Sequence, residues 1–170
     1  MAHSDRGDGG EGGSDGETQM DPRHEALALD LLVFRAGDNR FGLDAAQIGE
    51  VVRLQELELQ TGDSGPARGV YRDGREILVV EMTAVVGVTG SIPRGSAKVV
   101  LHASGGTEIG FVVGEPEEMA RVDVEGIEPL PPLLRPMVRG SGMWGLARLD
   151  GGLVILIDLA EAATGIAAHG

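Results

Sequence analysis

The chain of 170 residues carries a net charge of −13, because 27 aspartates and glutamates outnumber 14 lysines and arginines, and it has no cysteine. Disulfide scaffolds, thiol nucleophiles and cysteine-ligated metal sites are therefore excluded. An aromatic content of 3% and the excess of acid also argue against nucleic-acid binding, which requires clustered basic residues and stacking side chains.

The acidic charge is concentrated at the start of the chain. Residues 1–30 contain eight acids and two bases, and the first 20 residues are mostly Gly, Asp, Glu and Ser. Such a segment buries too little apolar surface to offset the entropy of ordering, so we predict a disordered, acidic, Gly-rich tail over residues 1–27 and a folded part over residues 28–166. The tail lacks the apolar core of a signal peptide, and no apolar run approaches the ~18 residues of a membrane helix. We expect a cytoplasmic protein without membrane insertion.

Short apolar runs separated by turn residues make up the folded part. Gly37–Arg40 supplies the turn chemistry of a first hairpin, and Asp44 is placed to cap a single helical turn after it. The predicted elements are, in chain order, a hairpin at residues 29–43, a helical turn at 44–47, a strand at 48–54, hairpins around turns at 73–74, 104–106 and 150–152, and short helices at 82–86 and 159–163. Short strands with glycine turns at this spacing are typical of an all-β barrel or sandwich.

The folded part contains two copies of one pattern. Four residues recur at a constant offset of 68 positions: Gly37, Gly42, Glu50 and Arg53 match Gly105, Gly110, Glu118 and Arg121. The later runs 77–82 and 154–159 match at an offset of 77, so the second copy has an insertion within residues 129–145. Two copies predict a pseudo-symmetric pair of small barrels, the first over about residues 30–90 and the second over about 95–165. Because a copy of about 65 residues is marginally stable alone, we expect the two to share an apolar interface.

Glu81 and Asp158 end two matching strands and are the best catalytic candidates. If one carboxylate from each copy met the other at the pseudo-twofold axis, the pair would form an acid dyad, so a two-repeat β-barrel hydrolase is one alternative function. The structural interpretation is a helix cap, because Asp158 and Glu161 have the spacing of a capping box and Glu81 occupies the equivalent strand-to-helix junction. The Asp-Thr/Ser-Gly triplet of an acid protease follows neither residue, so we favour the caps.

Two other patterns give weak signals. Residues 140–145 match GxGxxG, but a dinucleotide site needs a strand before the motif and a helix after it, and here a Pro-rich loop precedes it and an Asp-Gly hairpin follows. The four histidines are scattered, and His102 alone does not make a metal site. We therefore predict no catalytic residue, no cofactor and no metal, and we favour a binding or scaffolding protein.

Four segments carry motifs in a characteristic order: LLVFRAGDNRFGLDAAQIGEVVR at 31–53, ARGVYRDGREILVVEM at 67–82, EIGFVVGEPEEMARVDVEGIEPLPP at 108–132 and RGSGMWGLARLDGGLVILIDLAEAA at 139–163. Together they resemble the CheW-like chemotaxis coupling-protein family over roughly residues 29–165. The resemblance implies two intertwined five-stranded SH3-like barrels with short helices. It also implies a non-enzymatic adaptor that bridges the cytoplasmic tip of methyl-accepting chemoreceptors to the regulatory domain of a chemotaxis histidine kinase, with the receptor helix tip in an apolar groove between the barrels.

The resemblance further implies partner-contacting residues. The family's apolar and acidic contact positions match Ile48, Glu50 and Val51. Ile48 and Val51 also fit a partly buried core position, and Glu50 fits a solvated strand position.

One turn departs from the family pattern. Residues 71–74 (YRDG) replace the usual Asn-Leu-Arg-Gly turn, one residue shorter, so that Asp73 stands where the family has arginine. Arg72 and Arg75 are the candidates to replace that arginine, and we count Arg72 among the expected partner-binding residues. The charge reversal leaves open a CheW-like module that serves a kinase in a non-chemotactic pathway.

Overall fold

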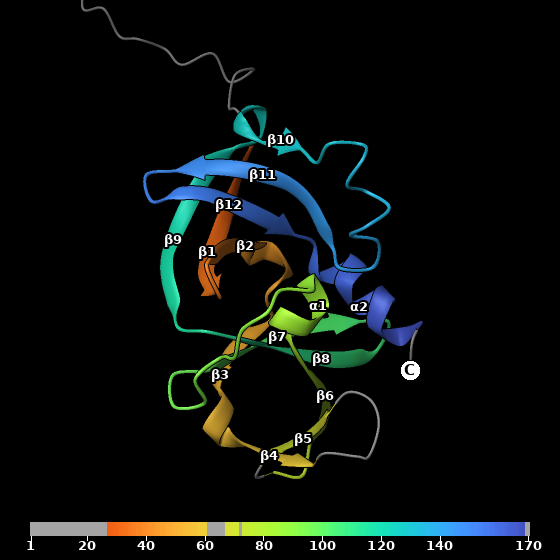
Figure 1. The fold of residues 1–170 in the computed structure, drawn as a ribbon. Helices are drawn as coiled ribbons and strands as arrows, with labels where there is room; N and C mark the ends of the chain where they lie inside the picture. Colours follow the sequence, from red (N-terminus) through yellow and green to blue (C-terminus); the bar gives the residue numbers. More distant parts are fainter. Residues whose placement is uncertain (1–26, 61–66, 72, 169–170) are drawn as a thin grey trace, which may run out of the picture.

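The structure is a computed structural model that describes residues 27–60, 67–71 and 73–168, and the predicted tail at residues 1–27 lies almost wholly outside them. Two six-stranded sheets make up most of it, each curved into a barrel-like form (Figure 1). In spatial order, sheet A consists of β10 (Glu128–Pro129), β11 (Met143–Leu149), β12 (Gly152–Ile157), β2 (Asn39–Asp44), β1 (Ala28–Ala36) and β9 (Pro116–Asp123). Sheet B consists of β3 (Glu50–Arg53), β7 (Lys98–Ser104), β8 (Thr107–Val113), β6 (Glu76–Glu81), β5 (Ala67–Tyr71) and β4 (Leu57–Gln60).

In each sheet, a single bent segment of the chain supplies both edge strands. In sheet B, β3 and β4 are separated only by the 3₁₀ turn η3 (Leu54–Glu56), yet they lie at opposite ends of the strand order. In sheet A, η4 (Val124–Gly126) separates β9 from β10 in the same way. Each six-stranded sheet therefore uses five extended chain segments, which reconciles it with the five-stranded barrel expected from the sequence.

The two copies exchange their first hairpins. β1 and β2 belong to sheet A, whose other strands come from the second half, whereas β7 and β8 belong to sheet B with the strands of the first half. The exchanged strands are joined in parallel, β2 to β12 and β8 to β6. A boundary between about residues 90 and 95 therefore separates the two sequence repeats, but it does not separate the two sheets.

Most predicted elements are confirmed. The four hairpins are present, and η2 (Ala45–Gln47) is the predicted helical turn, with Asp44 Oδ1 accepting a hydrogen bond from Ala46 N at 2.9 Å. The helix α1 (Met82–Val86) has the predicted bounds, whereas α2 (Leu159–Ala167) extends four residues beyond them. The strands β4, β9 and β10 were not predicted from the sequence.

An apolar cluster between the sheets confirms the expected shared interface. It joins side chains of exchanged hairpins and both α-helices, including Phe34, Phe41, Met82, Val100, Phe111 and Leu159. Two smaller clusters belong to the separate sheets, one in sheet A around Val33 and Val154 and one in sheet B around Val79 and Val99. Alternate residues of β1 enter different clusters, so this strand is buried on both faces, and this explains its continuous apolar sequence.

The repeated glycines lie where these doubly buried strands leave no room for a side chain. A Cβ atom at Gly42 would lie 3.1 Å from Val154 Cγ1, and one at its repeat equivalent Gly110 would lie 2.6 Å from Val99 Cγ1. Both contacts are with side chains of the barrel interiors. The recurrence of glycine at this position therefore follows from close packing in both copies.

We predict that Gly110→Ala destabilises the fold by about 1–3 kcal/mol, because the added methyl group overpacks the interior of sheet B. Chemical denaturation monitored by circular dichroism would measure the loss. Gly95→Ala is the matched control, since a Cβ at Gly95 meets nothing within 4 Å, and its effect should stay within about 0.5 kcal/mol. Equal effects of the two substitutions would contradict the packing argument.

Candidate functional site

The predicted contact residues lie along one edge of sheet B. Glu50 and Val51 are on β3, which is the terminal strand of the sheet and pairs with β7. Glu50 is exposed and Val51 is 41% exposed, whereas the half-buried Ile48 packs against the cluster between the sheets. The structure therefore exposes both Glu50 and Val51 on β3, with their side chains on opposite faces of the strand, and places Ile48 at the margin of the core. Arg72 lies outside the described residues.

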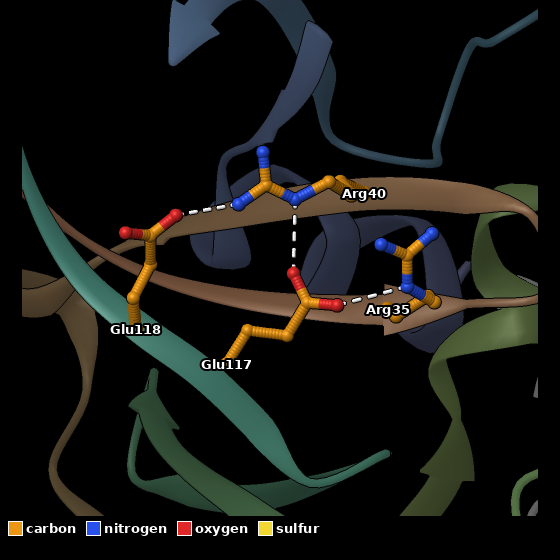
Figure 2. Close-up of polar contacts among 4 residues, drawn as sticks. All are labelled: Arg35, Arg40, Glu117 and Glu118. Carbon is orange, nitrogen blue, oxygen red and sulfur yellow. Dashed lines mark hydrogen bonds and ion pairs between the residues drawn. The ribbon is translucent and has the colours of Figure 1, made fainter. Parts of the chain in front are cut away.

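The repeat equivalent of Glu50 is Glu118, and it has a fixed partner. Arg40 donates from Nη2 to Glu118 Oε1 at 2.5 Å and from Nε to Glu117 Oε2 at 2.9 Å (Figure 2). Arg35 Nε donates to the other oxygen of Glu117 at 2.8 Å. Only 8% of the Arg40 side chain is exposed. The two arginines of the β1–β2 hairpin thus tie the start of β9, the edge strand of sheet A, to the hairpin.

Charge and packing both stabilise the Arg40 cluster, which consists of Arg35, Arg40, Glu117 and Glu118. The hydrogen bond from Arg40 lowers the pKa of Glu117 against the opposing effect of burial, and the same bond is the main cause that raises the pKa of Arg40. The turn between β11 and β12 covers the guanidinium so closely that a Cβ at Gly151 would lie 2.6 Å from Arg40 Nη1. The two carboxylates therefore compensate for burial of the Arg40 charge.

The region of sheet B that is equivalent to the Arg40 cluster by the sequence repeat has different ion pairs. The residue equivalent to Arg40 is Glu108, which forms an ion pair with Arg75 at 3.7 Å. The Arg75 guanidinium also lies 4.2 Å from the centre of the Tyr71 ring, so its charge is engaged within the sheet. Glu50 forms no ion pair with any residue that the structure describes. Its exposed carboxylate is therefore available to another molecule.

A groove of about 600 Å³ lies between the first-half elements β5, β6 and α1 and the second-half elements that precede β11 and form α2. Its surface is mainly apolar, with Glu81 and Arg139 as its charged lining residues. The remaining residues that line it are Ala67, Val79, Val80, Ala84, Val85, Gly140, Ser141, Gly165 and Ile166. Both halves of the chain thus contribute walls of one concave surface.

The predicted cap is confirmed for Asp158 and wrong for Glu81. Asp158 Oδ1 accepts hydrogen bonds from Glu161 N and from Gln47 Nε2, each at 3.1 Å. Glu81 precedes α1, but its carboxylate makes no cap hydrogen bond with that helix and instead accepts from Thr83 Oγ1 at 3.4 Å. Among the described residues, Glu81 lines the groove and Asp158 does not, so this groove holds no pair of these acids.

Gln47 connects α2 to both sheets. Its Oε1 accepts a hydrogen bond from Leu159 N at 2.8 Å, beside the bond from Gln47 Nε2 to Asp158. Its main-chain oxygen lies 2.7 Å from Nδ1 of the buried His102 on β7, which therefore donates. These bonds give His102 a structural role and fix the start of the helix that forms one groove wall.

The GxGxxG segment also has a packing role. It leads into the strand β11 instead of the helix that follows a dinucleotide-binding motif. Gly142 O accepts a hydrogen bond from Asp158 N at 2.7 Å, and a Cβ at Gly142 would collide with the Asp158 carbonyl oxygen. Glycine is needed here because the loop and the start of α2 are in direct contact.

The described residues contain no cluster of histidine and acid side chains that would hold a metal ion. No helix in that part of the chain is long and apolar enough to cross a membrane.

With this geometry established, comparison with known proteins identifies the family. A family model described as the CheW-like domain matches residues 30–166. The chain belongs to the CheW-like domain family. Among solved structures, the scaffolding protein TtCheW from Thermoanaerobacter tengcongensis is similar, with a TM-score of 0.65 and 21% sequence identity over 78% of this chain and 90% of that chain. The likeness supports the two-barrel CheW-like fold. Comparison with curated protein sequences gives no significant match.

The family resemblance implied an apolar groove between the barrels, but the sequence analysis missed the residues that line it and the partners of Arg40. The groove walls come from residues far apart in the chain, such as Ala84 and Arg139, and no local pattern joins them. Arg40 was assigned to the first hairpin turn, and its partners Glu117 and Glu118 lie too far along the chain for a local pattern to join them to it.

We predict that Glu117→Gln lowers stability by about 1 kcal/mol at pH 7 by removing a charge partner of Arg40. The folded-state pKa of Glu117 is lowered, so its contribution is present above the unfolded-state pKa and is lost as pH falls through the folded-state value. The wild-type advantage should therefore stay constant from pH 7 down to the unfolded-state pKa of about 4.5 and shrink below it. Urea denaturation across this range would measure it. Glu125→Gln, at an exposed position, is the control and should parallel the wild type.

Proposed function

We propose that this CheW-like protein is a non-enzymatic cytoplasmic adaptor that couples the helical tip of a chemoreceptor to the regulatory domain of a chemotaxis-type histidine kinase. Membership of the CheW-like family over residues 30–166 supports the scaffolding role. The observation that carries the proposal is the groove between elements of the two halves, because an apolar, preformed groove is the surface that an amphipathic helix requires.

The receptor tip is assigned to this groove. Val80, Val85 and Ile166 offer apolar surface, and the charged Glu81 and Arg139 supply a polar rim that would fix the register of a bound helix. The groove wall from α2 is fixed by Gln47, so the surface is largely formed before a partner binds. A preformed apolar surface with a charged rim is consistent with reversible recognition of a helix.

The kinase regulatory domain is assigned to the edge strand β3. The exposed Val51 supplies an apolar contact, and the neighbouring Glu50 supplies a carboxylate with no ion pair among the described residues. Because these side chains point to opposite faces of β3, they favour a partner that contacts this edge strand with an apolar side chain on one face and a basic side chain on the other. Two separate surfaces would let one small protein hold receptor and kinase together.

A kinase of a non-chemotactic pathway is the second candidate partner. Asp73 replaces the family arginine, and Arg75 is engaged by Tyr71 and Glu108 instead of extending freely. The turn between β5 and β6 is therefore more acidic than the family pattern. Binding to kinase domains from each kind of pathway would separate the two candidates.

We predict that Glu50→Arg leaves the fold intact and weakens binding to the kinase regulatory domain by at least about tenfold, because reversal of an exposed interface charge repels a basic partner. Isothermal titration calorimetry at two salt concentrations would measure it. Glu58→Arg, at an exposed position on β4, is the matched control. Unchanged affinity of a folded Glu50→Arg variant would remove β3 from the interface.

We predict that Ala84→Arg blocks the groove and abolishes co-sedimentation with assembled receptor-tip fragments while kinase binding is retained. Ala84 is exposed on α1, so the larger side chain enters the groove without disturbing the core. Ala160→Arg is the control, since Ala160 is exposed on α2 but does not line the groove. Receptor binding that survives Ala84→Arg as well as Ala160→Arg would place the receptor elsewhere.

A further inference from the structure

The insertion that lengthens the second copy forms an apolar surface beside the groove. It connects β10 to β11 and runs from the end of sheet A toward α2 (Figure 1). We call this region, residues 130–144, the β10–β11 surface. It contains four of the nine large hydrophobic side chains that are exposed in the described part of the chain, namely Leu133, Leu134, Met137 and Trp144. Leu133 and Met137 are 83% and 80% exposed, so the fold itself gives them little to contact.

The charge of this region is opposite to that of the whole chain. Residues 129–149 contain three arginines and no acid, although the chain carries −13. Arg135 donates only to the main-chain oxygen of Leu130, at 3.4 Å, and Arg139 forms no ion pair with a described residue. Arg148 forms an exposed ion pair with Glu128 at 3.8 Å. Two exposed guanidinium groups therefore lie beside the apolar side chains without an ion pair to a carboxylate in the part of the chain that the structure describes.

The surface is also concave. A pocket of about 450 Å³ has apolar walls from Leu130, Pro132, Pro136, Val138, Met143 and Trp144. Its polar lining residues are Arg135 and Arg139 with Glu161 of α2. A pocket with apolar walls and two arginines accepts an apolar side chain while carboxylates of the same ligand pair with the arginines.

We propose that the β10–β11 surface binds an acidic amphipathic segment of another protein. Charge complementarity selects this ligand, because Arg135 and Arg139 attract carboxylates that the acidic remainder of the chain repels. The concave pocket favours an inserted side chain over a flat lipid surface, and the net charge of −13 disfavours both an anionic membrane and a second copy of the chain. The proposal does not depend on the adaptor role, and Arg139, which also lines the groove, places the two surfaces next to each other.

Trp144 provides a direct probe because it is the only tryptophan of the chain and lines the pocket. The ligand probe is a synthetic amphipathic peptide with leucines at helical spacing and glutamates elsewhere. Its addition to the full chain should move the Trp144 emission to shorter wavelength, and added salt should weaken the binding. The same peptide with lysine in place of glutamate should give no shift, since Arg135 and Arg139 repel it.

Matched variants locate the binding. Arg135→Glu should weaken peptide binding by at least about tenfold, whereas Arg94→Glu, the same charge reversal at an exposed position of the other sheet's surface, should have less than about a twofold effect. Met137→Glu should weaken it, and Met119→Glu, at a methionine 60% exposed on β9, should not. These exposed positions keep the fold intact. Ala84→Arg should leave the peptide effect unchanged, which separates this surface from the groove.

Three results would overturn the proposal. The first is that Arg135→Glu and Arg94→Glu weaken peptide binding equally, which would mean that binding depends only on the net charge of the chain. The second is a Trp144 shift with phosphatidylglycerol vesicles and none with the peptide, which would assign the surface to a membrane. The third is a shift that depends on protein concentration alone, with a dimer in analytical ultracentrifugation, which would assign it to a second copy.

Discussion

Four strands, β1, β2, β7 and β8, lie between the interiors of the barrels and the cluster that joins them, and the rest of the structure depends on this double burial. A copy of about 65 residues buries too little surface to be stable alone. Exchange of the hairpins solves this, because each hairpin completes one sheet and presents its other face to the shared cluster around Phe34, Phe41 and Phe111. Gly42 and Gly110 are then required, since the opposite faces of the same strands are packed as well.

The same exchange determines the shape of the groove. Gln47 follows the exchanged hairpin directly, and it bonds to the start of α2 and to His102 of sheet B. α2 is therefore held by the first half of the chain, while α1 packs on the shared cluster through Met82. The two helices contribute to a groove whose walls cannot separate without breaking these contacts, and this rigidity favours the proposed role of holding one partner in a fixed position relative to another.

The sequence predicted the features that leave local or periodic signals. Hairpin turns at glycine, the cap by Asp44, the repeat offset and the shared interface all follow from neighbouring residues or from recurrence, and the structure confirms them. The cap by Glu81 failed because the longer side chain bonds to Thr83 instead of the helix backbone. The groove and the Arg40 cluster depend on which strands pair across the exchange, and no local pattern encodes that pairing. The family resemblance predicted Glu50 as a partner-contacting residue. The structure adds that Glu50 is exposed and forms no ion pair with a described residue.

The two copies differ in residues at the protein surface, outside the packed interior. In sheet A, Arg40 neutralises Glu118, and the end of the sheet is closed by ion pairs. In sheet B, the residue equivalent to Arg40 is Glu108, and the acid equivalent to Glu118, which is Glu50, has no ion pair with a described residue. The second copy diverges in turn by the insertion that carries Leu133, Met137 and Arg135. In a duplicated fold, the packed interior has to stay equivalent in both copies, so sequence changes accumulate at edge strands and connecting loops. The proposed binding surfaces lie on an edge strand, β3, and on a connecting loop, between β10 and β11.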